Sequence, residues 1–206
     1  MRFLSVNHLR LGSAPAGIPA HSGTKASAFS TASVWQRAVN LAIRENVHAV
    51  LLSGEIISPR NTGLEPWGPL LDGLTELHRA GIPTIAVENG EFSTANLARF
   101  TTIESVHWLT DTLDWDPALT TNITPRDTPT VHVFAGSLAE SNNAPAKNPV
   151  TLEQIDHPDS IWILTVPLQP DQIDAEHALV IEPGSTSPLA PSETGTHGAW
   201  LIDTDI

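Results

Sequence analysis

Short apolar runs alternate with longer amphipathic segments over residues 1–90. The apolar runs have the length and composition of buried strands, and they cover residues 1–6, 48–55 and 84–89. Between them, apolar residues recur every three or four positions, which predicts helices over residues 31–46 and 66–80. This order of elements predicts parallel strand pairing, because each connection is long enough to cross over the sheet.

Each predicted helix carries one apolar stripe and a recognisable end. In the first helix the stripe consists of Val34, Ala38, Leu41 and Ala42, and either Thr31 or Ser33 can cap the start. The stripe of the second helix consists of Leu70, Leu74 and Leu77, and Gly81 is expected to end that helix.

The second half of the chain has a different pattern, in which strands dominate. Short strands are expected within residues 106–115, 130–137, 160–166, 177–183 and 198–204, with one short helix at 148–155. Residues 140–149 and 183–198 have the composition of loops. We find no internal repeat and no linker, so the pattern favours an α/β fold of two packed sheets with helices outside.

Composition narrows the range of functions. The 206 residues include 10 Lys and Arg against 23 Asp and Glu, a net charge of -13, which argues against direct nucleic-acid binding. The absence of Cys excludes disulfides, thiolate metal sites and thiol nucleophiles. The sequence shows neither a signal peptide nor an apolar run long enough to span a membrane, so we expect a cytoplasmic protein without membrane contact.

Four stretches resemble, in order, the motifs of one enzyme family. They are MRFLSVNHLRLG at 1–12, VHAVLLSGEIIS at 47–58, AGIPTIAVENGEF at 80–92 and PGSTSPLAPSETGTHGAWLIDTD at 183–205. The chain resembles the calcineurin-like metallophosphoesterases, most closely their bacterial DNA-repair exonuclease (SbcD-like) branch. The resemblance covers nearly the whole chain. It implies a four-layer α/β/β/α sandwich of two mixed sheets flanked by helices, as a single domain over residues 1–206.

The metal-binding motifs of that family are largely replaced in this chain. Family members hold two divalent metals that clamp a phosphate ester and activate water, and their opening motifs are D-x-H and G-D. Position by position, His8 replaces the first Asp, Arg10 replaces the following His, and Glu55 replaces the Asp that bridges both metals.

The remaining family ligands are also missing. In the G-N-H-D motif Asn89 is retained, whereas Gly90 stands in place of the catalytic His. Ala135, Val166 and Leu168 stand where later motifs carry histidines. The resemblance therefore implies a vestigial site.

Arg10 is the most informative of these replacements. A guanidinium is a permanent cation, so it cannot ligate a metal and it repels a divalent ion. We expect Glu55 to pair with Arg10, because burying a carboxylate without a cation is costly. We therefore expect neither a metal nor another cofactor. The alternative is a one-metal site on His8, Glu55 and Asn89, loaded with manganese or another divalent ion.

These replacements predict a degenerate metallophosphoesterase-like protein that lacks metal-dependent hydrolase activity and acts by binding a ligand or a protein partner. One alternative is an active phosphoesterase or DNA-repair exonuclease-like hydrolase with an unusual metal site. Another is a non-catalytic subunit of a DNA-processing complex, docked on a coiled-coil ATPase. Trp67 lies between two prolines, and we expect it to be exposed as a partner anchor.

Overall fold

The computed structural model describes residues 1–14, 26–58, 64–88, 102–108, 130–134, 160–164, 178–180, 185–186 and 197–203. The chain divides into two compact units. The first comprises Met1–Thr110 and Gly184–Asp205, and the second comprises Asp111–Pro183 with Ile206. The second unit is therefore inserted, along the chain, between the two segments of the first. The sequence analysis expects a single domain over residues 1–206. Whether the two units together form that domain stays a prediction.

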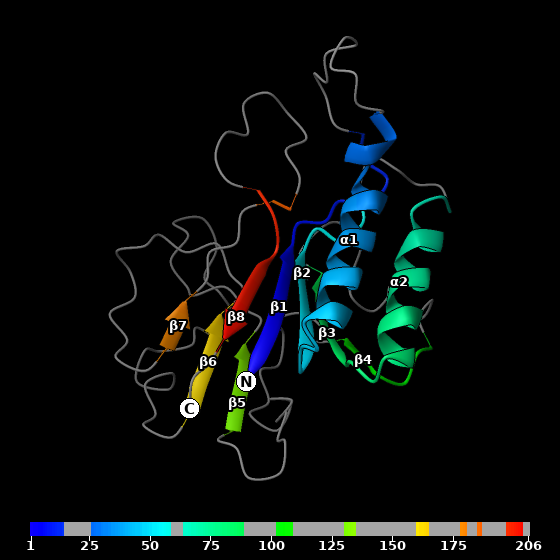
Figure 1. Ribbon diagram of the computed structural model, residues 1–206. Coiled ribbons are helices and arrows are strands. Elements are labelled where there is room, and N and C mark those ends of the chain that lie inside the picture. Colours follow the sequence, from blue (N-terminus) through cyan, green and yellow to red (C-terminus); the bar gives the residue numbers. More distant parts are fainter. Residues whose placement is uncertain are drawn as a thin grey trace. The chain divides into compact units, whose positions relative to one another are not determined.

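A five-stranded sheet, with strand order β4-β3-β2-β1-β8, forms the centre of the first unit (Figure 1). Its strands are β1 (Arg2–Asn7), β2 (Ala49–Gly54), β3 (Thr84–Glu88), β4 (Val106–Trp108) and β8 (Trp200–Asp203). The first four are parallel, and β8 runs antiparallel to β1. The three strands expected in the first half, and their parallel pairing, are confirmed.

Two helices, α1 (Thr31–Arg44) and α2 (Trp67–Arg79), connect the first three strands and lie side by side (Figure 1). A short 3₁₀ helix, η1 (Ala26–Phe29), precedes α1. Both helices pack on the sheet face that carries Leu4, Val6, Val50 and Leu52. The opposite face is buried as well, since Phe3, Leu51 and Ile85 are at most 2% exposed. At the central strands β1, β2 and β3 both faces are thus removed from water, which explains why β1 and β2 read as continuous apolar runs.

The buried stripe of α1 differs from the predicted one. It consists of Thr31, Trp35, Ala38, Val39 and Ala42, so the helix is rotated relative to the expectation and Val34 and Leu41 are only partly buried. The large indole of Trp35 sets this rotation by occupying the centre of the contact with α2. The N-cap is Ser30 rather than Thr31 or Ser33, because the Ser30 hydroxyl accepts the Ser33 N–H at 3.2 Å.

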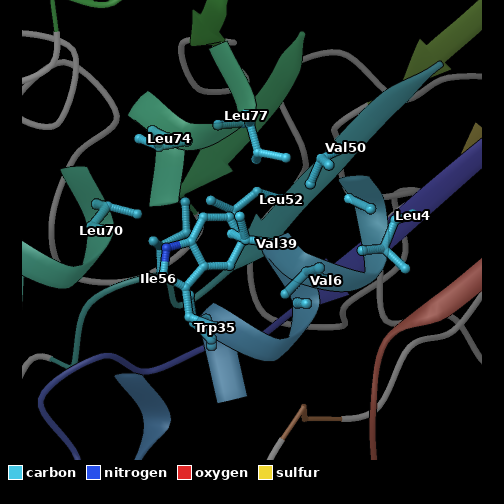
Figure 2. Close-up of a cluster of buried hydrophobic side chains, with 14 of the residues drawn as sticks. Leu4, Val6, Trp35, Val39, Val50, Leu52, Ile56, Leu70, Leu74 and Leu77 are labelled. Carbon is cyan, nitrogen blue, oxygen red and sulfur yellow. The ribbon is translucent and has the colours of Figure 1, made fainter. Parts of the chain in front are cut away.

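Trp35 joins α1 to α2. Its indole Nε1 donates to the Pro69 carbonyl at 3.1 Å, and the ring lies directly over Gly73, where no side chain could fit. Figure 2 shows the indole in the middle of the buried cluster that includes Val39, Leu52 and Leu70. The stripe predicted for α2, with Leu70, Leu74 and Leu77, is confirmed.

Both helices end in the same hydrogen-bonded motif. After α2, Gly81 has φ +74° and donates to the His78 carbonyl, while Ile82 donates to the Leu77 carbonyl. After α1, Asn46 has φ 49° and the equivalent pair of hydrogen bonds forms. These are Schellman motifs, in which a left-handed residue closes the last turn. The expected termination by Gly81 is confirmed.

In the second unit the described strands form a three-stranded parallel sheet, β5 (Thr130–Phe134), β6 (Ser160–Leu164) and β7 (Ala178–Val180), in that order. Each strand lies within a predicted strand range. The expected α/β class is confirmed, whereas the four-layer sandwich of two mixed sheets stays a prediction. The helix expected at 148–155 and the loop at 140–149 lie outside the described residues.

The expected exposure of Trp67 is wrong. Trp67 is the first residue of α2 and packs, partly buried, against the core, because the two prolines start a helix there rather than hold an open loop. Among the tryptophans whose side chains the structure describes, Trp200 is the exposed one, with 53% of its surface accessible on the edge strand β8. Within the described ranges, no helix combines the length and apolar character needed to cross a membrane.

Candidate functional site at the carboxyl ends of β1 and β2

The candidate site lies where β1 and β2 end. The two strands are parallel neighbours, so their carboxyl ends meet at one edge of the sheet, where α/β proteins commonly place their sites. Backbone hydrogen bonds continue beyond the strands. The His8 N–H donates to the Ser53 carbonyl at 2.9 Å and the Arg10 N–H to the Glu55 carbonyl at 2.8 Å. The turn after β1 is therefore fixed to the turn after β2.

Apolar residues anchor both turns in the core. Leu9 and Leu11 after β1, with Ile56 and Ile57 after β2, are at most 1% exposed. Leu11 and Ile57 form a further isolated bridge between the turns. The polar residues His8, Arg10 and Glu55 interrupt these anchors and are only partly buried.

The turn after β1 has an unusual backbone. His8 has φ 45° and Arg10 has φ 49°, the left-handed region that non-glycine residues seldom occupy. A non-glycine residue in this conformation lowers the stability of the fold by about 1 kcal/mol, and the conformation persists only where surrounding contacts hold it. Strain of this kind clusters at functional sites, which makes the turn a candidate site.

Arg10 and Glu55 form the expected ion pair. Arg10 Nε lies 2.9 Å from Glu55 Oε2, and the two side chains are 27% and 34% exposed. The pair is therefore neither fully solvated nor deeply buried. Together with the hydrogen bond between their backbones, it connects the same two residues twice.

His8 is held by the same neighbour. The Glu55 N–H donates to His8 Nδ1 at 3.3 Å. The imidazole lies so close to Gly54 that a Cβ on that residue would be 2.7 Å from Nδ1. A neutral imidazole with an accepting Nδ1 carries its proton on Nε2, so this contact selects the tautomer.

Beneath the turns, Ser5, Asn7 and Ser53 form a buried polar chain. The Asn7 side-chain amide donates to Ser5 Oγ at 2.9 Å, and the Ser53 hydroxyl donates to Asn7 Oδ1. The three residues are at most 3% exposed. Buried polar groups must be paired, and this pairing fixes the last residue of β1 directly before His8.

A distant segment closes over the end of β1. The Thr186 N–H donates to the Asn7 carbonyl at 3.1 Å, and the Ser185 hydroxyl donates to the His8 carbonyl at 3.3 Å. His197 Nδ1 in turn lies 3.0 Å from the Ser185 carbonyl. These contacts fix the segment at Ser185 and Thr186 to the end of β1. Within the described segments, the Thr186 hydroxyl is a buried group without a hydrogen-bond partner.

The described side chains do not fit a two-metal centre. The single lone pair of a neutral His8 imidazole accepts the Glu55 N–H, and the Glu55 carboxylate faces a guanidinium. Divalent metals need several free carboxylate or imidazole donors. No group of three or more His, Asp or Glu residues in the described part of the chain could hold a metal ion.

Several predicted site positions lie outside the described residues, namely Asn89, Gly90, Ala135, Val166 and Leu168. Their expected role in a vestigial site stays a prediction. The structure brings together His8, Arg10 and Glu55, which follow adjacent parallel strands. Sequence reasoning missed the chain of Ser5, Asn7 and Ser53. Its signal was three small polar residues in two largely apolar strands.

No protein-family model matches the chain, and no curated protein shows significant similarity to it. Among solved structures, the chain is similar to a dimetal phosphatase from Danio rerio. The TM-score is 0.44 and the sequence identity 14%, over 82% of this chain and 70% of that chain. Similarity of this degree identifies no family.

Proposed function

We propose that this protein is a degenerate metallophosphoesterase-like protein that acts by binding a ligand or a protein partner, without metal-dependent hydrolysis. The observation that carries the proposal is the ion pair between Arg10 and Glu55, at the positions of two metal-binding residues in the resembled family. The cytoplasm is the expected compartment.

The chemistry of the resembled enzymes requires two divalent ions that bind the phosphate ester and activate a water molecule. The Arg10 guanidinium, with Nε 2.9 Å from Glu55 Oε2, competes with such ions for the Glu55 carboxylate and repels them. His8 does not compensate, because its Nδ1 already accepts a backbone hydrogen bond. Because neither Glu55 nor His8 is available as a metal ligand, the two turns keep the shape of the family's site without the metal ions that would activate a water molecule.

Elemental analysis combined with a phosphoesterase assay tests the proposal. We expect protein produced with excess manganese to carry no stoichiometric transition metal and to hydrolyse bis(p-nitrophenyl) phosphate at the rate of the buffer blank. The control variant Glu55→Gln, which removes the Glu55 carboxylate, should give the same values.

Near-stoichiometric manganese together with hydrolysis that Glu55→Gln abolishes would sink the proposal and favour the active phosphoesterase or exonuclease-like hydrolase. The other alternative, a non-catalytic subunit of a DNA-processing complex, also predicts no bound metal and no hydrolysis. That alternative is a special case of the binding function, with a coiled-coil ATPase as the partner.

A further inference from the structure

We infer that Arg10 is the built-in cation of this site, replacing a divalent metal as the positive charge that Glu55 requires and so preserving the shape of the two turns. The inference rests on the proposed function, because it concerns the same site. It adds a specific requirement: the arrangement depends on a cation beside Glu55, and this chain supplies the cation itself.

The placement of the pair supports this role. Glu55 follows directly on Gly54, the last residue of β2, and lies between buried anchors. Its side chain is about two-thirds buried, so solvent alone compensates its charge poorly. The guanidinium Nε at 2.9 Å provides that compensation as a charge-assisted hydrogen bond.

The backbone around Arg10 shows that its position is imposed. Arg10 is held at φ 49° while its N–H donates to the Glu55 carbonyl at 2.8 Å. An exposed ion pair between two long flexible side chains contributes little to the free energy of folding, because ordering the side chains costs entropy. Here the backbone bond already fixes the two residues relative to each other, which lowers that entropic cost.

The cation also acts on His8 through Glu55. The Glu55 N–H is the donor to His8 Nδ1, so a displacement of Glu55 removes the contact that selects the imidazole tautomer. Arg10 is therefore a positioning residue for His8. Its effect is measurable from the ring nitrogens of His8 without any assay of activity.

The test is chemical rescue of Arg10→Ala. We expect this variant to lose about 5 °C or more in Tm and to lose the Nε2–H tautomer of His8 in ¹⁵N NMR spectra. Guanidinium chloride at roughly 20 mM, far below denaturing concentrations, should restore part of both losses relative to equal potassium chloride. It should leave the wild type and the double variant Arg10→Ala/Glu55→Gln unchanged. Rescue of the single variant by manganese chloride would equally support a required cation.

Two further variants keep the inference testable if Arg10→Ala does not fold. Arg10→Lys retains the positive charge, so it should keep the Tm and the His8 tautomer of the wild type. Arg10→Met retains much of the side-chain length but not the charge, so it should lose both. Equal behaviour of the two variants, or an Arg10→Ala protein with unchanged Tm and tautomer, would overturn the inference. Metal in the wild-type protein would contradict the proposed function and this inference together, whereas unchanged Arg10 variants without bound metal would contradict the inference alone, so the two failures are distinguishable.

Discussion

At the scale of single residues, close packing between Gly54 and His8 determines the geometry of the site. Gly54 has φ +78°, and the His8 imidazole occupies the space that a Cβ would take. The ring therefore reaches the Glu55 N–H across a bare backbone. A glycine at the end of β2 thus serves both the left-handed turn and the orientation of His8.

We predict that Gly54→Ala destabilises the protein more than Gly81→Ala does. Gly81 has a similar φ of +74° but nothing within 4 Å of the added Cβ, so its substitution measures the left-handed backbone alone. That cost is about 1–2 kcal/mol, whereas Gly54→Ala should cost roughly 1 kcal/mol more because it also displaces His8. Urea unfolding measures both values. The extra cost should disappear in a His8→Ala background, and its persistence there would contradict this account.

At the scale of secondary-structure elements, the contact between α1 and α2 depends on one large and one absent side chain. Trp35 fills the interface, and Gly73 leaves room for its ring. The hydrogen bond from Trp35 Nε1 to the Pro69 carbonyl satisfies the indole N–H inside the contact. The helix pair is therefore set by shape as well as by its apolar stripes.

We predict opposite effects for alanine at two glycines of α2. Gly68→Ala should stabilise the protein by up to about 1 kcal/mol, because Gly68 is exposed and nothing lies within 4 Å of the added Cβ. Gly73→Ala should destabilise it by about 1–3 kcal/mol, since the new methyl group would overlap the Trp35 indole. Chemical denaturation, followed by far-UV circular dichroism, compares them. A neutral or stabilising Gly73→Ala would mean that α1 and α2 separate at little cost.

The sequence predicted these elements well because their signals are local. Apolar runs and helical periodicity locate the strands and helices, and Gly81 marks the end of α2. The rotation of α1 was not predictable in this way, because a period of three to four fits both Val34 and Trp35 as the stripe's first member. Only the packing of Trp35 over Gly73, across 38 residues of sequence, selects the second.

The candidate site was predictable to the extent that it follows strand ends. Parallel neighbours bring the residues after β1 and β2 together, so the contact between Arg10 and Glu55 could be expected, and it is present. The contacts of Ser185 and Thr186 with this turn could not be expected from local patterns, because they depend on how a distant segment returns to β1.

At the scale of the whole molecule, the first unit is built from two segments that are separated along the chain by the second unit. Strand β8 completes the sheet by pairing with β1. Arg2 is paired with Asp203 at one end of the contact, and Ser5 is paired with Trp200 at the other. A two-pronged ion pair reinforces this closure. Arg2 Nε and Nη2 donate to the two Asp203 carboxylate oxygens at 2.7 and 2.8 Å.

Closure of the sheet should therefore depend on acid pH through Asp203. The Arg2 guanidinium, mainly through its hydrogen bonds, lowers the pKa of the Asp203 carboxyl below its ordinary value of 3.8. A folded-state pKa below the unfolded one stabilises the fold above the unfolded value, and that stabilisation is lost as the pH falls through the folded value. Asp203→Asn lacks the titrating group, so it serves as the reference.

We expect the wild type to be more stable than Asp203→Asn between pH 5 and pH 7, and we expect this difference to shrink as the pH falls below 3.8. Urea unfolding at pH 7, 5, 4 and 3 measures the free energies of both proteins. Asp72→Asn, on the exposed side of α2, controls for the loss of a carboxylate elsewhere. Because β8 ends the second segment of the first unit, hydrogen exchange should locate the acid-induced loss of protection at β8 and the start of β1. A difference between wild type and Asp203→Asn that stayed constant from pH 7 to pH 3 would show that the contact with Arg2 contributes nothing to closure.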